Sequence, residues 1–178
     1  MNGVDLLVKE HDNILLFIEK VRKSCKEIMN GKEVDTDLFR KYISFARNYA
    51  DAHHHGKEEL ILFKIMVDEL GPVAEKLIKH GMLVEHDFGR LFMASLEEAL
   101  DKYDQEKNDD VKLDIIANAI GYGNLLKRHI DKENAVVYTF ATRELSDELL
   151  ARVDEETKVF EEKEDERRRE YLELLNQF

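Results

Sequence analysis

Apolar residues recur every three to four positions along most of the chain, which is the period of amphipathic helices. The pattern predicts a first helix over about residues 4–29, ended by the C-cap pair Asn30 and Gly31. A second helix follows, which Thr36 is expected to cap and which ends at Gly71, where Pro72 suits the first turn of a short helix. The inward face of this second helix consists of Ile43, Ala46, Ala50, His54, Glu58, Ile61, Leu62 and Ile65.

Two more long helices complete the pattern. We expect a bend at Gly81, a third long helix that ends near Tyr103, and a charged loop over residues 104–110. The fourth helix has an inward face made of Ile115, Tyr122, Leu125, Leu126, His129, Glu133, Val136, Val137 and Phe140. Four long helices joined by modest connections predict an all-α, up-down-up-down four-helix bundle over residues 1–145.

The composition changes after about Ser146. Residues 154–170 are mostly charged, which is typical of a solvated helix with ion pairs between residues four apart. The last apolar residues are Tyr171, Leu172, Leu174, Leu175 and Phe178. We therefore expect residues 146–178 to form an additional charged C-terminal helix. Its apolar end could dock on the bundle, on a second copy in a homodimer, or on another protein partner.

The bulk composition narrows the class of protein. Among 178 residues there are 8 Gly and 1 Pro, too little turn chemistry for a sheet protein. The net charge of -12 disfavours nucleic acid and anionic membranes as partners. The single cysteine, Cys25, excludes an internal disulfide and a cysteine-based zinc site, and we expect it to be buried. No signal peptide or membrane-spanning run is recognisable, so we expect a cytoplasmic protein.

The residues that carry chemistry occur in two copies, 75 positions apart. The repeated segments are Glu10-His11-Asp12 with Glu85-His86-Asp87, and His54-x-x-Lys57-Glu58 with His129-x-x-Lys132-Glu133. Each half therefore supplies one isolated histidine and one His-x3-Glu pair. The duplication predicts two helical hairpins that are related by a pseudo-two-fold axis and hold two metal ions between them.

Three consecutive histidines compete for the inward position of the second helix. On a straight α-helix, residues four apart share a face. His54 and Glu58 share the apolar face, whereas His55 falls on a polar face. His53 is paired with Lys57, which cannot bind a metal while it is protonated. We therefore predict that His54 binds metal and that its two neighbours do not.

Carboxylates on apolar helix faces are costly to bury unless a partner offsets the charge. Glu58 and Glu133 both lie on such faces, each beside an inward histidine. Two His–Glu hydrogen bonds in an apolar core would be the purely structural explanation, but two symmetric pairs with two further histidines favour metal. The predicted ligands are His11, His54, Glu58, His86, His129 and Glu133. This donor set suits two iron ions, with zinc or manganese as substitutes. Because every predicted ligand precedes Ser146, the tail should be dispensable for the metal site.

With these motifs the chain resembles the hemerythrin-like family, also called the HHE cation-binding domain. The resemblance covers roughly residues 4–140. Beyond the repeated segments it includes His55, Gly56, Glu59, Leu62, Phe63 and Arg90. The family implies a non-haem diiron centre with an oxo or hydroxo bridge inside a four-helix bundle. It also implies reactions with dioxygen, nitric oxide or peroxide.

The chain departs from the oxygen-carrying members of that family in its ligand pattern. Those members have a second histidine one turn before that of the third helix, where this chain has Met82, and they end with His-x4-Asp instead of His-x3-Glu. One nitrogen ligand is therefore missing or comes from elsewhere. His80, across the expected bend, and Tyr122, two turns before His129, are the alternatives. A missing ligand would leave an open position and favour reduction of an oxidant over reversible oxygen transport.

Several functions stay open at this point. The chain could bind or sense dioxygen or nitric oxide, it could be a diiron enzyme that reduces peroxide or oxygen, or it could store iron or deliver it for iron–sulfur repair. A ferritin-like diiron bundle is disfavoured because its Glu-x-x-His motif is absent here. A bundle without metal is the structural alternative.

Overall fold

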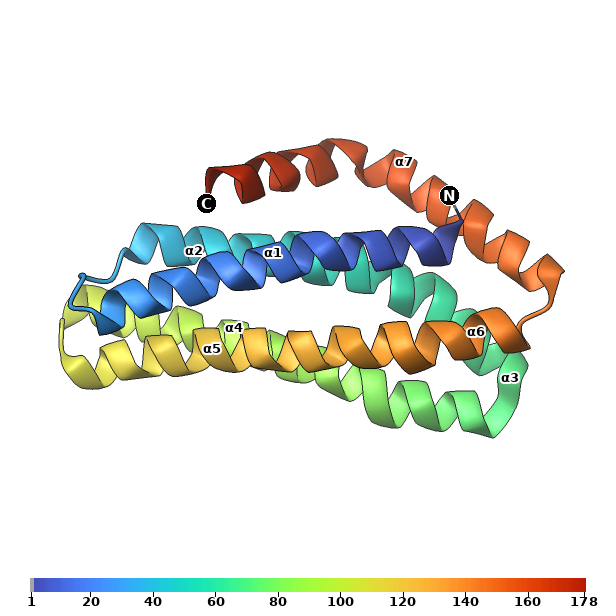
Figure 1. Ribbon diagram of the computed structural model, residues 1–178, viewed down its shortest axis with the longest axis horizontal. Helices are drawn as coiled ribbons and strands as arrows, with labels where there is room; N and C mark the ends of the chain where they lie inside the picture. The colour runs from blue at the N-terminus through green and yellow to red at the C-terminus, as the bar shows by residue number, and fades with distance from the viewer. Residues whose placement is uncertain (1) are drawn as a thin grey trace.

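The computed structural model describes residues 2–178, which are helical almost throughout (Figure 1). The elements in chain order are α1 (Gly3–Met29), α2 (Thr36–Phe45), η1 (Ala46–His55), η2 (Glu58–Leu62), α3 (Phe63–Leu77), η3 (Ile78–Met82), α4 (Leu83–Gln105), α5 (Asp109–Lys132), η4 (Glu133–Val137), α6 (Tyr138–Glu144) and α7 (Asp147–Gln177). The elements labelled η are π-helical, with hydrogen bonds from residue i to i+5 and therefore a wider turn than an α-helix.

Four long helical segments form an all-α bundle, which confirms the predicted fold class (Figure 1). The first is α1, and the second runs from α2 through η1 and η2 into the first part of α3, up to Gly71. The third starts at Pro72 with the rest of α3 and continues through η3 and α4, and the fourth combines α5, η4 and α6. Short connections make neighbouring segments antiparallel, as expected for an up-down-up-down bundle.

Most helix ends agree with the sequence pattern. Asn30 caps α1, and Gly31 follows it with φ 93°, a conformation that favours glycine. The second segment ends at Gly71, where φ is 70°, and Pro72 starts the returning helix, as predicted. The predicted cap of α2 was wrong by one residue, because the side chain of Asp35, and not that of Thr36, accepts the hydrogen bond from the Leu38 backbone N–H.

Two details of the third segment differ from the prediction. Gly81 lies inside η3, so the expected bend at this residue is replaced by one widened helical turn. The loop before the fourth segment is also shorter than residues 104–110. Residues 106–108 separate α4 from α5, because the side chain of Asn108 accepts from Val111 N and starts α5 early.

The apolar core has two parts. One cluster includes Ile14, Phe17, Phe45, Leu96, Tyr122 and Leu126. The other includes Leu7, Leu62, Met66, Met82, Val137 and Tyr138. In each of the four segments, the histidines and glutamates of the repeat fall between positions that belong to these two clusters. The fold therefore places a polar layer across the middle of an apolar bundle.

The C-terminal helix α7 begins after Ser146, whose side chain accepts from Leu149 N, and lies along α1 and α2 (Figure 1). Its side chains Val153, Thr157 and Leu175 are buried. Leu175 belongs to the first apolar cluster, and Tyr171, Leu172, Leu174 and Phe178 pack against that cluster. The apolar end of the tail therefore packs on the chain's own bundle, which is one of the three possibilities named from the sequence.

Candidate metal centre

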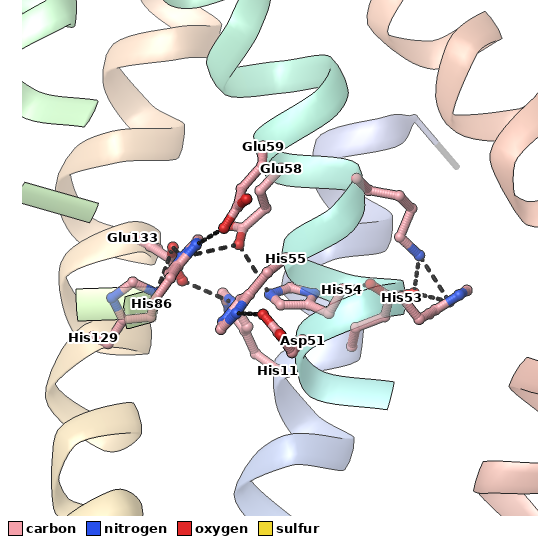
Figure 2. A network of polar contacts seen from close by, with 12 residues as sticks. His11, Asp51, His53, His54, His55, Glu58, Glu59, His86, His129 and Glu133 are labelled. Carbon is pink, nitrogen blue, oxygen red and sulfur yellow. Dashed lines mark hydrogen bonds and ion pairs between the residues drawn. The ribbon is translucent and has the colours of Figure 1, made fainter. Parts of the chain in front are cut away.

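Seven side chains meet in the polar layer of the bundle. They are His11 from α1, His54 and His55 from η1, Glu58 from η2, His86 from α4, His129 from α5 and Glu133 from η4. Each is at most 4% exposed. Figure 2 shows these side chains converging from separate helices. The six residues singled out in the sequence are thus brought together, and His55 joins them.

The seven residues form two groups that share one carboxylate. Site 1 consists of His55, Glu58, His86 and His129, and site 2 consists of His11, His54, Glu58 and Glu133. Within each group, one nitrogen or oxygen atom of every residue lies within 4.8 Å of those of the others. Each group is therefore compact enough for its members to bind a common ion.

The two glutamates face both sites. Glu58 Oε2 lies 3.7 Å from His54 Nε2 and 3.6 Å from His86 Nε2. Glu133 Oε2 lies 3.2 Å from His11 Nε2, while its Oε1 lies 2.9 Å from His129 Nε2. Both carboxylates therefore lie between histidines of site 1 and histidines of site 2, the arrangement that bridging ligands of two metals need.

The expectation that His55 lies on a polar face was wrong. Its ring is buried and stacks on that of His86, with ring centroids 3.7 Å apart. The prediction assumed a straight α-helix with 3.6 residues per turn. The chain is π-helical from Ala46 to His55, and the wider turn places the consecutive residues His54 and His55 on the inner side together.

Each of the four repeated histidines donates from Nδ1 to a partner that orients it. His54 and His129 donate to Glu10 and Glu85, at 2.9 Å each. His86 donates to Glu59 at 2.6 Å, and His11 to the Asn134 side-chain oxygen at 2.9 Å. These partners are themselves related by the 75-residue offset. They fix the rings so that each Nε2 faces the centre, as outer partners of metal-binding histidines do.

The remaining imidazole, His55, is oriented from the surface. Its Nδ1 lies 3.2 Å from Asp51 Oδ1. Arg90 donates to Asp51 at 2.8 Å and to Glu59 at 2.7 Å, so it is an ion-pair partner of both carboxylates. Arg90 thus supports the partners of both His55 and His86, two members of site 1.

Two positions break the pseudo-two-fold symmetry inside the centre. The counterpart of His55, 75 residues later, is the buried apolar residue Ile130. The counterpart of Phe63, which stacks on His86, is Tyr138, which stacks on His11. The hydroxyl of Tyr138 donates to Glu58 Oε1 at 2.5 Å and lies 3.4 Å from His11 Nε2. Site 1 therefore has the additional imidazole, and site 2 has the hydroxyl.

Burial and neighbouring charges together determine the electrostatics of the centre. Burial and the neighbouring charge of Glu133 raise the pKa of Glu58 well above its usual value. Burial also opposes ionisation of Glu133, but His129, His11 and His86 more than offset it and hold the pKa of Glu133 low. Burial lowers the pKa of His54 to about 4, so its imidazole is neutral at pH 7, as metal binding requires.

Several buried atoms of the centre have no hydrogen-bond partner within the described part of the chain and could bind a cation instead. His54 Nε2, Glu58 Oε2 and both carboxylate oxygens of Glu133 are buried without a hydrogen-bond donor or acceptor among residues 2–178. Buried polar atoms are rarely left unpaired, because the cost of desolvation is then not recovered. Lone pairs of imidazoles and carboxylates that converge in this way suit one or more divalent cations.

The alternatives considered for an additional ligand lie away from the two groups. His80 is exposed on η3. Tyr122 is buried and lines a small cleft of about 20 Å³ beside His55 and His86, but it belongs to neither site. Met82 is buried in the second apolar cluster. His55 adds one imidazole to the centre, so the number of imidazoles is the same as if position 82 were a histidine.

The 75-residue repeat points to three residues whose roles were not predicted, namely Glu10, Glu85 and Tyr138. Glu10 and Glu85 belong to the repeated segments, and the structure shows that they orient His54 and His129. Tyr138 could have been found by comparing it with Phe63 across the same offset. For His55 the only signal was its place in the family motif, since neither the repeat nor the helical period reveals the position of a π-helical turn.

Comparison with known families identifies the family of the chain. The sequence model of the hemerythrin HHE cation-binding domain matches residues 2–141. The chain belongs to this family, as its motifs suggested. Searches of curated proteins and of solved structures found no match. Among residues 2–178, no helix has the length and apolar character needed to cross a membrane.

Proposed function

We propose that the chain holds two iron ions and binds or reduces a small oxidant at them. The ligands would be the six residues predicted from the sequence, with His55 added. The observation that carries the proposal is the pair of buried carboxylates, Glu58 and Glu133, each facing histidines of both sites. Five imidazoles and two carboxylates are a donor set that suits iron, while zinc or manganese could substitute.

The two sites would not be equivalent. With both carboxylates shared, site 1 offers three imidazoles and two carboxylates, whereas site 2 offers two imidazoles and two carboxylates. The additional imidazole of site 1 is His55. A small ligand such as dioxygen, nitric oxide or peroxide would therefore bind at site 2, where fewer protein donors compete for the ion.

Tyr138 is the residue of site 2 that could recognise such a ligand. An iron pair supplies electrons to a small oxidant and a positive charge that attracts an anion. The buried hydroxyl of Tyr138 already donates a hydrogen bond beside His11. It could donate to a bound anion or peroxide instead, and the apolar clusters on both sides of the layer would keep bulk water away.

Iron storage or delivery is supported less well. All seven donors are buried, and every histidine among them has an orienting partner. Release of iron would require opening of the bundle. The departure at Met82 likewise no longer argues against oxygen binding, since His55 matches the number of imidazoles.

The proposal is tested with protein loaded with ferrous iron under argon and then mixed with dioxygen or peroxide in a stopped-flow spectrometer. We expect a rapid change in the absorption spectrum that requires about two iron ions per chain. Repeated turnover of peroxide would identify an enzyme, and a stable adduct without turnover would identify a binding or sensing protein. A loaded protein that reacts no faster than free ferrous iron would contradict the proposal.

A further inference from the structure

A second buried polar cluster lies beside site 2. It consists of Glu10, His53, Lys57 and Glu161, the last of which comes from α7. The Lys57 side chain is completely buried and donates to both carboxylates, and its Nζ lies 2.9 Å from His53 Nε2. Glu10, His53 and Glu161 could hold a metal by their spacing, but the Lys57 ammonium already supplies a cation to all three.

This cluster is connected to a proposed iron ligand. Glu10 uses one oxygen, Oε1, for Lys57 and the other, Oε2, for His54 Nδ1 at 2.9 Å. His54 belongs to site 2. A chain of contacts therefore runs from Glu161 on α7 through Lys57 and Glu10 to a ring that faces the centre.

The other half of the repeat contains the same series of contacts, but without a counterpart of Glu161. Lys132 donates to Glu85, and Glu85 accepts from His129 Nδ1 at 2.9 Å. The Lys132 side chain is 46% exposed, whereas that of Lys57 is 0% exposed. The difference between the halves comes from α7, which covers Lys57 and provides Glu161.

Specific contacts hold this part of α7 in place. The ring of Phe160 packs on Gly56, where an added Cβ would lie 3.3 Å from Phe160 Cζ, and on the Lys57 ammonium. One turn earlier, Thr157 packs on Gly3, with the corresponding distance 3.0 Å to its Oγ1. These close approaches fix Glu161 at the only buried lysine of residues 2–178.

We propose that Glu161 is a positioning residue for site 2, which holds Lys57 against Glu10 so that Glu10 in turn fixes the His54 ring. The C-terminal helix would then influence one of the two irons selectively, in contrast to the expectation from the sequence that the tail is dispensable for the metal site. This inference rests on the proposed function only for its effect on iron, because the orientation of His54 can also be measured without metal.

The test compares three variants. Glu161→Gln removes the charge but keeps the shape, and Glu161→Asp keeps the charge. Glu162→Gln is the matched control, since that neighbouring side chain on α7 is 68% exposed. Release of iron from each protein to an excess of chelator is followed with time. Loss of an outer partner of a metal ligand typically costs about 10- to 100-fold in affinity.

We expect Glu161→Gln to release one of the two irons at least about tenfold faster, with the second unchanged. Glu161→Asp should recover part of the loss, and Glu162→Gln should behave as the unmodified protein. Equal release from Glu161→Gln and the unmodified protein would overturn the proposal. Equal acceleration of both irons would overturn it as well, since that indicates general loosening.

Metal-free protein separates this inference from the proposed function. In nitrogen-15 spectra of the histidine rings, Glu161→Gln should shift the Nδ1 signal of His54 and leave that of His129 unchanged. An unchanged His54 signal would refute the positioning role. If the chain binds no iron but His54 shifts as expected, the proposed function fails and the positioning role stands.

Discussion

Removal of the Tyr138 hydroxyl should weaken binding of small anions at site 2. Tyr138→Phe deletes the donor that lies 2.5 Å from Glu58 Oε1 and 3.4 Å from His11 Nε2, and keeps the ring that stacks on His11. A hydrogen bond to a charged group contributes about 1.5–3 kcal/mol. Since about 1.4 kcal/mol corresponds to a factor of ten, the affinity for an anion should fall by about 10- to 140-fold.

The assay is a titration of the ferric protein with azide, followed by absorption, after the iron content has been measured. Tyr122→Phe is the matched control, because it removes another buried hydroxyl, near His55 and His86 of site 1. We expect unchanged azide affinity for Tyr122→Phe. If Tyr122→Phe weakens azide binding and Tyr138→Phe does not, the open position is at site 1 and the assignment of the two sites is wrong.

Three further predictions concern the ligands and their support. His54→Ala and His55→Ala should each lower the iron content of the purified protein, whereas His53→Ala should retain both irons. If His55→Ala also retains both irons, His55 is not a metal ligand. Met82→His should lower the free energy of unfolding by about 1–3 kcal/mol, because it buries an imidazole without a partner, and a stabilised variant with more iron would contradict this. Arg90→Ala should speed release of the site 1 iron by about tenfold, because Asp51 and Glu59, which orient two histidines of that site, lose their ion pair. An unchanged release rate would show that Asp51 and Glu59 keep their positions without Arg90.

The architecture and most of the centre could be predicted because burial follows the helical period. The positions of His11, His86 and His129 each fall on an apolar face of a regular helix, so a pattern with 3.6 residues per turn places them inward. The duplication supplied a second, independent reason to choose Glu58 and Glu133. Both lines of reasoning depend on local periodicity and on spacing, which the sequence contains directly.

The remaining features depend on departures from that periodicity and on tertiary packing. His55 faces inward because the backbone widens into a π-helical turn, which no apolar pattern reveals. From the sequence, Lys57 was excluded only as a metal ligand, because it is protonated, and its burial was not predicted. It is buried because Glu10 and Glu161 compensate that charge, and the second of these carboxylates arrives from α7, more than a hundred residues later in the chain.

The central claim is that the bundle holds two iron ions in inequivalent sites. The most direct test is Mössbauer spectroscopy of the full chain loaded with iron-57, combined with the iron content per chain. We expect two irons per chain and two quadrupole doublets of equal area, since site 1 has the additional imidazole of His55. One iron per chain, no bound iron, or two irons in a single doublet with identical parameters would contradict the claim.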